Sequence, residues 1–226
     1  MKNTGFITIN NCYVHQRNTG GQKMVKKICL GLLSFLVTSS TVLAQPVNYT
    51  VQTGDSMWKI ASKYEVGVDE IIAENTGVTN PSVIYPGQVL KVPTINDIKA
   101  LENEVIRLVN VERKKAGIPT LQANWQLCRI ARYKSQDMVN KHYFSHTSPT
   151  YGSPFKMMES FGIKFYAAGE NIAYGQKTTA EVMTSWMNSP GHRSNILSPA
   201  YRQIGVGLAK DASGVCYWTQ QFINPM

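Results

Sequence analysis

The sequence predicts an α+β fold arranged as two modules in tandem. Residues 48–93 show the order strand, helix, helix, strand (βααβ). Apolar residues at helical spacing then follow, and two β-prone runs separated by Gly214 close the chain as a hairpin would. The second module, residues 98–226, is long enough for one compact core.

The first half of the small module combines a strand and a helix. Residues 49–52 alternate apolar and polar side chains, and Thr53 and Gly54 form a turn signal. Asp55 is then a good helix N-cap. The next apolar residues fall at helical spacing: Met57, Ile60, Ala61 and Tyr64. We expect Trp58, on the same helix, to pack in the core as well.

The second half of the small module combines a helix and a strand in the reverse order. A short helix fits residues 68–75, with Asp69 and Glu70 in its first turn, where negative charge favours the helix dipole. Residues 86–87 are a Pro-Gly turn signal, and residues 89–92 supply the second strand of a two-stranded sheet.

A linker of only four residues, 94–97, leads to the second module. Its first helix begins near Asp97 and ends before Gly117; its apolar positions are Ile98, Leu101, Val105, Leu108 and Val109. A second helix follows, whose candidate core positions are Trp125, Leu127, Ile130, Ala131 and Met138.

The first 44 residues are typical of targeting rather than of folded structure. Lys26 and Lys27 precede a short apolar run, residues 28–37, and small residues lead to Ala44, a favourable cleavage position. We therefore interpret residues 24–44 as a secretory signal peptide and residues 1–23 as an upstream extension. The run is too short for a permanent membrane span, so we expect none in the mature chain.

Cleavage after Ala44 would lower the net charge. The whole chain carries +9, from 23 Lys and Arg against 14 Asp and Glu. Five of the basic residues and none of the acidic ones lie in residues 1–44, which leaves a net charge of +4. This modest excess suits an anionic cell wall, whereas the basic cluster with interleaved aromatics that nucleic-acid binding needs is absent from the sequence.

Cleavage would also leave only two cysteines, Cys128 and Cys216. In a secreted chain they can form one disulfide, which would stabilise the fold by about 4 kcal/mol in the chain-entropy model. Two buried thiols are the alternative, and the sequence leaves both open.

Residues 49–61 and 80–93 resemble the LysM module, which binds N-acetylglucosamine polymers such as peptidoglycan and chitin. The resemblance implies a shallow sugar groove between two loops. By position, these loops supply the glycan-binding residues Gly54, Asp55, Ser56, Met57, Ile84, Tyr85, Pro86 and Gly87.

The second module resembles the CAP (SCP-like) superfamily in its bacterial, cysteine-poor form. Six motifs carry the resemblance in family order: residues 109–113, 143–146, 169–173, 186–193, 204–207 and 217–222. The resemblance implies a three-layered α/β/α sandwich around an antiparallel sheet, with residues 205–208 and 216–222 as late strands.

The same resemblance implies a central cleft that holds a divalent metal such as zinc in many members from eukaryotes. His146 and Glu170 match two of the four ligands, whereas Ser189 and Tyr217 stand at the other two positions. His192 is a candidate replacement. Zinc held by His146, Glu170 and His192 and a metal-free, hydrogen-bonded cluster therefore both stay open.

Other catalytic arrangements are disfavoured by spacing. His142 and His146 lie four residues apart without the Glu of a zinc peptidase, so His142 is expected to be a solvated helix residue. Glu181 is expected to face solvent rather than pair with Glu170 as acid and base. Asn171 and Arg193 belong to the cleft motifs and are expected to fix its walls.

These features predict a secreted protein of the cell wall or spore envelope. Its LysM module would bind peptidoglycan or a chitin-like glycan, and its CAP module would bind a ligand or a wall or spore-coat protein. The alternative is a wall-directed hydrolase that uses His146 and Glu170; the sequence leaves enzymatic activity open and leans against it.

Overall fold

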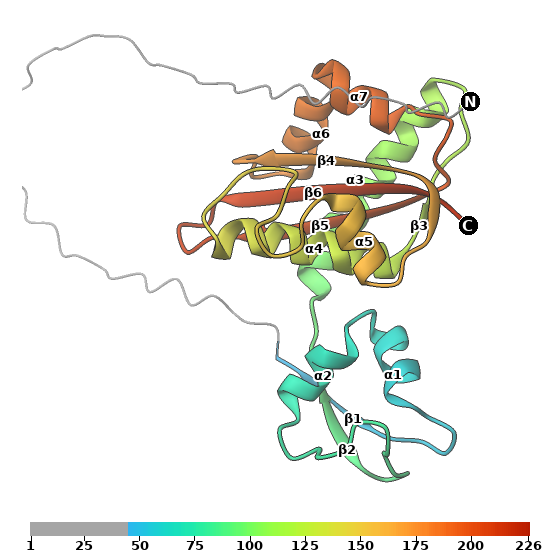
Figure 1. Cartoon of the computed structure of the whole chain (residues 1–226), viewed down its shortest axis with the longest axis vertical. Coiled ribbons are helices and arrows are strands. Elements are labelled where there is room, and N and C mark those ends of the chain that lie inside the picture. The colour runs from blue at the N-terminus through green and yellow to red at the C-terminus, as the bar shows by residue number, and fades with distance from the viewer. Residues whose placement is uncertain (1–44) are drawn as a thin grey trace, which may run out of the picture. The chain divides into compact units, whose positions relative to one another are not determined.

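The computed structural model describes residues 45–226 (Figure 1). The segments interpreted as an upstream extension and a signal peptide, residues 1–23 and 24–44, lie outside the described residues. No helix of the described part is long and apolar enough to cross a membrane. The described chain mixes helices and strands throughout, so the predicted α+β class is confirmed.

The small module has the predicted βααβ order. Its elements are β1 (Val47–Thr50), α1 (Met57–Tyr64), α2 (Val68–Glu74) and β2 (Val89–Val92). The two strands pair antiparallel, with Val47 opposite Val92. A compact core lies between the sheet and the helices; its fully buried members include Ile60, Ala61, Val66, Ile71, Leu90 and Val92.

Two sequence-based expectations for α1 are wrong. Ser56, and not Asp55, caps the helix, because the Ser56 hydroxyl accepts a hydrogen bond from the backbone N–H of Lys59 (3.2 Å). The Asp55 carboxylate is engaged elsewhere, since it accepts hydrogen bonds from the Tyr49 hydroxyl and the Gln52 backbone N–H. Trp58 is exposed rather than packed in the core.

The second module is a three-layered sandwich built on a four-stranded sheet of order β3-β5-β6-β4 (Figure 1). Its strands are β3 (Gln122–Ala123), β4 (Phe165–Tyr174), β5 (Gln203–Lys210) and β6 (Cys216–Pro225). Strands β4 and β5 pair antiparallel with β6. The sequence did not predict β3, a two-residue strand that runs parallel to β5.

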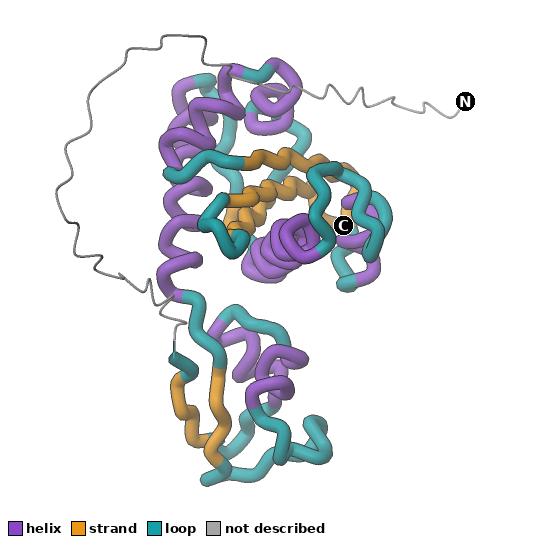
Figure 2. The backbone as a smooth tube through the Cα atoms, turned by 90° about the vertical axis from the view of Figure 1, so that its left-hand side faces the viewer, coloured by secondary structure: helices purple, strands orange, loops and turns teal. Residues whose placement is uncertain are grey.

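Helices cover both faces of this sheet, and Figure 2 shows the strands between the two helical layers. One layer contains α3 (Asn96–Lys115), α6 (Thr179–Asn188) and α7 (Pro190–Ile196). The other contains α4 (Trp125–Asn140) and α5 (Pro154–Ser160). The two cores they enclose include Trp186, Trp218 and Phe222 on the first side and Leu127, Ile130 and Met157 on the second.

Glycines in β5 let α4 lie directly on the sheet. A Cβ atom added to Gly205 would stand 2.3 Å from the backbone carbon of Leu127. One added to Gly207 would stand 2.0 Å from the backbone nitrogen of Arg132. Any larger residue at these positions would push the helix away, so close packing of α4 requires both glycines.

Strand β4 forms one edge of the sheet, and side chains cover its outer carbonyls. Ala168, Glu170 and Ile172 alternate along the strand, and their carbonyl oxygens accept hydrogen bonds from Tyr201 Oη (3.3 Å), Asn195 Nδ2 (3.2 Å) and Trp186 Nε1 (3.4 Å) respectively. An edge strand with occupied carbonyls is a poor template for pairing with another chain.

Cys128 and Cys216 are both buried free thiols, which contradicts the disulfide alternative. Burial raises the pKa of the Cys128 thiol to about 12, so this side chain stays protonated at neutral pH and packs as a small apolar group.

Candidate functional site

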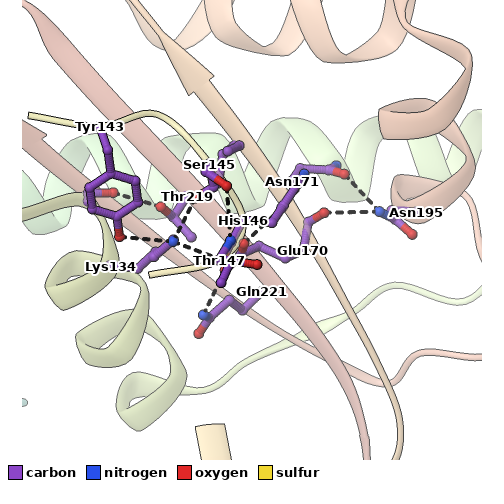
Figure 3. Close-up of polar contacts among 12 residues, drawn as sticks. Lys134, Tyr143, Ser145, His146, Thr147, Glu170, Asn171, Asn195, Thr219 and Gln221 are labelled. Atoms are coloured by element: carbon purple, nitrogen blue, oxygen red, sulfur yellow. Dashed lines mark hydrogen bonds and ion pairs between the residues drawn. The ribbon is translucent and has the colours of Figure 1, made fainter. Parts of the chain in front are cut away.

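A polar cluster lies at the edge strand β4, where the loop after α4 meets the sheet (Figure 3). His146 comes from that loop, Glu170 from β4 and Gln221 from the facing position of β6. A hydrogen bond of 2.9 Å joins His146 Nδ1 to Glu170 Oε1, and Gln221 Nε2 donates to Glu170 Oε2 (3.1 Å). The Glu170 carboxylate is therefore buried with both oxygens bound, whereas the side chain of His146 remains 22% exposed.

A buried lysine on α4 fixes the loop that carries His146. Lys134 Nζ donates to the carbonyl oxygens of Ser145 (2.7 Å) and His146 (2.9 Å) and to the Tyr143 hydroxyl (3.1 Å), as Figure 3 shows. Burial lowers the pKa of Lys134, while the nearby Glu170 and Asp137 carboxylates favour its charged form. Charge-assisted bonds to two consecutive carbonyls hold the His146 backbone in place.

Asp137, one helical turn further along α4, binds the rest of the same loop. Its carboxylate accepts hydrogen bonds from Tyr143 Oη (2.6 Å), Ser148 Oγ (2.7 Å) and Thr150 Oγ1 (2.6 Å). These bonds outweigh the effect of burial and lower the pKa of Asp137. Lys134 and Asp137 together make the loop a rigid part of the site.

The other side of β4 carries an amide network. Asn171 Nδ2 donates to Gln220 Oε1 (3.0 Å) and to the backbone carbonyl of His192 (3.1 Å), and Asn195 Nδ2 donates to Asn171 Oδ1 (2.9 Å). This network holds the start of α7, and with it His192, against the edge strand. Burial, and next the nearby His146, lower the pKa of His192, so its neutral form is favoured.

The sugar-groove loops of the small module lie together at one end of its sheet. Backbone hydrogen bonds join Val51 to Gln88 (2.8 Å) and Gly87 to Val51 (2.9 Å), which brings the loop after β1 to the loop before β2. Most of the predicted groove residues are open to solvent, and the side chain of Tyr85 is 67% exposed. Met57 is buried and belongs to the core beneath.

A shallow, open hollow of about 360 Å³ also lies on this module. Of the predicted groove residues, only Tyr85 lines this hollow. The remaining lining residues are Gly77, Val78, Thr79, Asn80, Val83 and Gln88. A second hollow of similar size separates α3 from α6 and contains no residue of the His146 cluster.

Comparison with known families matches both modules. The model of the cysteine-rich secretory protein (CAP) family matches residues 106–222, more than half of the chain. The chain belongs to the CAP family. The LysM domain model matches residues 49–93, so the small module is a LysM domain.

Relatives match either most of this chain or a short part of it. YkwD of Bacillus subtilis, described as uncharacterized, is 45% identical over 184 residues, which are 81% of this chain and 64% of YkwD. A Bacillus cereus protein named spore coat assembly protein ExsA is 48% identical over 46 residues, 20% of this chain and 7% of that protein. The chain thus spans less than two thirds of the length of either relative.

A solved structure supports the fold of the CAP domain. An extracellular SCP-domain protein from Bacillus anthracis is 32% identical, with a TM-score of 0.52 over 62% of this chain and 47% of that one.

The CAP cluster does not fit the expected zinc site. Within residues 45–226, no three His, Cys, Asp or Glu side chains are arranged to hold a metal ion, so His146, Glu170 and His192 do not form a ligand set. His146 Nδ1 is bonded to Glu170, which leaves Nε2 as the ring nitrogen available to a ligand. His192 Nδ1 is buried and has no hydrogen-bond partner in the described structure.

Three other residues considered from the sequence take no part in the hydrogen bonds of this cluster. Arg193 is exposed on α7. His142 follows the end of α4 in a left-handed turn (φ 53°), not in a helix as expected. Glu181 is exposed as predicted and closes the capping box of α6 with Thr178.

Sequence reasoning missed the residues that support the cluster. Lys134, Asp137 and Gln221 did not stand out, because helical or strand periodicity says nothing about a polar residue that a distant loop covers. A signal was present for the two α4 residues, since a Lys and an Asp three positions apart fall among buried apolar positions of an amphipathic helix.

Proposed function

We propose that this protein is a secreted, wall-associated protein that binds peptidoglycan through its LysM domain and a further ligand or partner through its CAP domain. The observation that carries the proposal is the LysM domain itself, with two exposed loops brought together at Val51 and Gly87. Backbone groups in such loops can pair with the amide and hydroxyl groups of an N-acetyl sugar.

The signal-peptide interpretation of residues 24–44 and the similarity to an extracellular SCP-domain protein support secretion. The similarity of the LysM domain to a spore coat assembly protein supports a place in the spore envelope. Wall or spore-coat proteins are then the partners that the CAP domain would meet.

Sedimentation with purified peptidoglycan tests the proposal. The intact protein is expected to pellet with the insoluble polymer, and Tyr85→Ala is expected to remain largely in solution. Val89→Ala is the matched control, because Val89 is an exposed LysM residue outside the two loops. Equal pelleting of Tyr85→Ala and Val89→Ala would remove the support for the groove.

A second candidate function is hydrolysis of wall glycan, stem peptide or protein. The hydrogen bond between His146 and Glu170 favours it, because a carboxylate can orient a histidine for general acid–base chemistry. Soluble fragments released by the intact protein, but not by a His146→Ala, Glu170→Ala double variant, would establish this activity. If neither protein released fragments, the result would contradict hydrolysis and agree with the binding function.

A further inference from the structure

Three aromatic side chains outside the core lie in a row on the CAP domain. The ring centroids of Phe144 and Tyr174 are 5.9 Å apart, and those of Tyr174 and Tyr217 are 4.8 Å apart. Tyr174 and Tyr217 face each other across β4 and β6. Phe144 is 41% exposed and Tyr174 49% exposed, so the row presents ring surface to solvent.

This aromatic row, Phe144, Tyr174 and Tyr217, continues from the polar cluster. Glu170 and Tyr174 lie four residues apart on β4 and therefore point to the same face, about 13 Å apart along the strand. Phe144 precedes His146 by two residues in the loop that Lys134 and Asp137 hold. A short oligosaccharide is long enough to lie on the row and reach the exposed edge of His146.

The combination of flat apolar surface and a polar end selects a class of ligand. Exposed aromatic rings in contact with one another form contiguous apolar surface, and such surface is typical of binding sites. Tyrosine offers a ring face for apolar contact and a hydroxyl for hydrogen bonds, and sites for small polar molecules combine such surfaces with a few placed polar groups. Sugars match this pattern, since their rings have C–H faces and hydroxyl or amide edges.

An extended peptide is disfavoured as the occupant. Peptides commonly bind by adding a strand to a free sheet edge, where backbone hydrogen bonds supply affinity. Strand β4 is that edge next to the row, and the carbonyls of Ala168, Glu170 and Ile172 are already occupied by side chains of the same domain. A sugar chain can bind through side chains and does not need free backbone groups of a strand.

We propose that Phe144, Tyr174 and Tyr217, together with the exposed edge of His146, form a saccharide-binding subsite of the CAP domain for the same amino-sugar polymer that the LysM domain binds. This inference rests on the proposed function, because the LysM domain defines the class of polymer. Two weak contacts on one polymer strengthen each other, since binding of the first raises the local concentration of the second.

The test is the affinity of the intact protein for soluble, peptide-free glycan strands, measured by isothermal titration calorimetry for wild type and single variants. Tyr174→Ala is expected to weaken binding about three- to tenfold, the range that one aromatic contact supplies. Tyr174→Phe keeps the ring and is expected to lose less affinity than Tyr174→Ala. Tyr166→Ala is the matched control, because Tyr166 is a 74% exposed tyrosine of the same strand outside the row.

Separate variants distinguish the failure of the inference from that of the proposed function. Tyr85→Ala tests the LysM groove alone. Unchanged glycan affinity of Tyr85→Ala would contradict the proposed sugar groove, whereas the affinity of Tyr174→Ala would still test the aromatic row. Equal affinities of Tyr174→Ala, Phe144→Ala and Tyr166→Ala would overturn the subsite. Binding of sugar-free stem peptides that Tyr174→Ala abolishes, without an effect on glycan, would also overturn it by assigning the row to a peptide.

Discussion

Single residues on α4 set the geometry of the candidate site. Lys134 is fully buried, and its ammonium group binds the backbone carbonyls of Ser145 and His146. Asp137 binds three hydroxyl groups of the same loop. The His146–Glu170 contact depends on these bonds, because a loop without them would leave His146 free to turn away.

Lys134→Met is expected to destabilise the CAP domain by about 2–4 kcal/mol, because two carbonyl oxygens lose a buried donor. The measurement is urea-induced unfolding. Lys164→Met, at an exposed lysine of the same domain, is expected to change stability by less than about 0.5 kcal/mol. Equal stabilities of the two variants would contradict the role of Lys134.

Glu102 on α3 makes stability depend on pH. Burial raises the pKa of Glu102 to about 7, although an ion pair with Arg132 at 3.0 Å favours the charged form. Between the ordinary pKa of 4.5 and about 7, the folded chain binds a proton that the unfolded chain releases. The free energy of unfolding therefore falls as pH rises through this range, by up to about 3 kcal/mol.

Glu102→Gln is expected to remove this contribution, because the amide oxygen can still accept from the Leu208 N–H but the side chain no longer ionises. Urea unfolding between pH 4.5 and 7.5 measures it. Glu159→Gln, at an exposed glutamate of α5, is expected to keep the wild-type profile. A Glu102→Gln profile as steep as wild type would show that other groups cause the pH dependence.

At the scale of the elements, the sequence predicts the LysM domain more completely than the CAP site. Strand β2 has the predicted bounds, because turn residues and alternation mark it locally. The predicted N-cap of α1 is wrong by one residue, because the Asp55 carboxylate accepts hydrogen bonds from Tyr49 and Gln52 instead of from the helix backbone. In the CAP domain, the motifs identify His146 and Glu170, but the amphipathic pattern of α4 does not show what covers Lys134 and Asp137.

Gly207→Ala tests the contact between α4 and β5. The added Cβ would overlap backbone atoms of Ala131 and Arg132. Because a side-chain rotation cannot relieve a clash with the backbone, we expect the free energy of unfolding to fall by about 3 kcal/mol or more. Gly191→Ala is the control, because no atom lies within 4 Å of its added Cβ and alanine favours the helix. The measurement is the shift in unfolding midpoint; similar midpoints for both variants would mean that α4 moves away at little cost.

At the scale of the whole molecule, the chain joins a LysM domain to a CAP domain that carries a hydrogen-bonded polar cluster. The metal ligands that the CAP resemblance suggests are incomplete, with Ser189 and Tyr217 at two of the four positions. Tyr217 instead joins an exposed aromatic row. This arrangement is the basis of the proposed binding role of the CAP domain.

The most direct test of the central claim is an NMR titration of the mature chain with a soluble N-acetylglucosamine oligomer. The LysM assignment predicts that the largest amide shifts fall in residues 54–57 and 84–87, with small shifts elsewhere in that domain. An oligomer that leaves both loops unshifted at millimolar concentration would contradict the claim that this domain binds wall glycan.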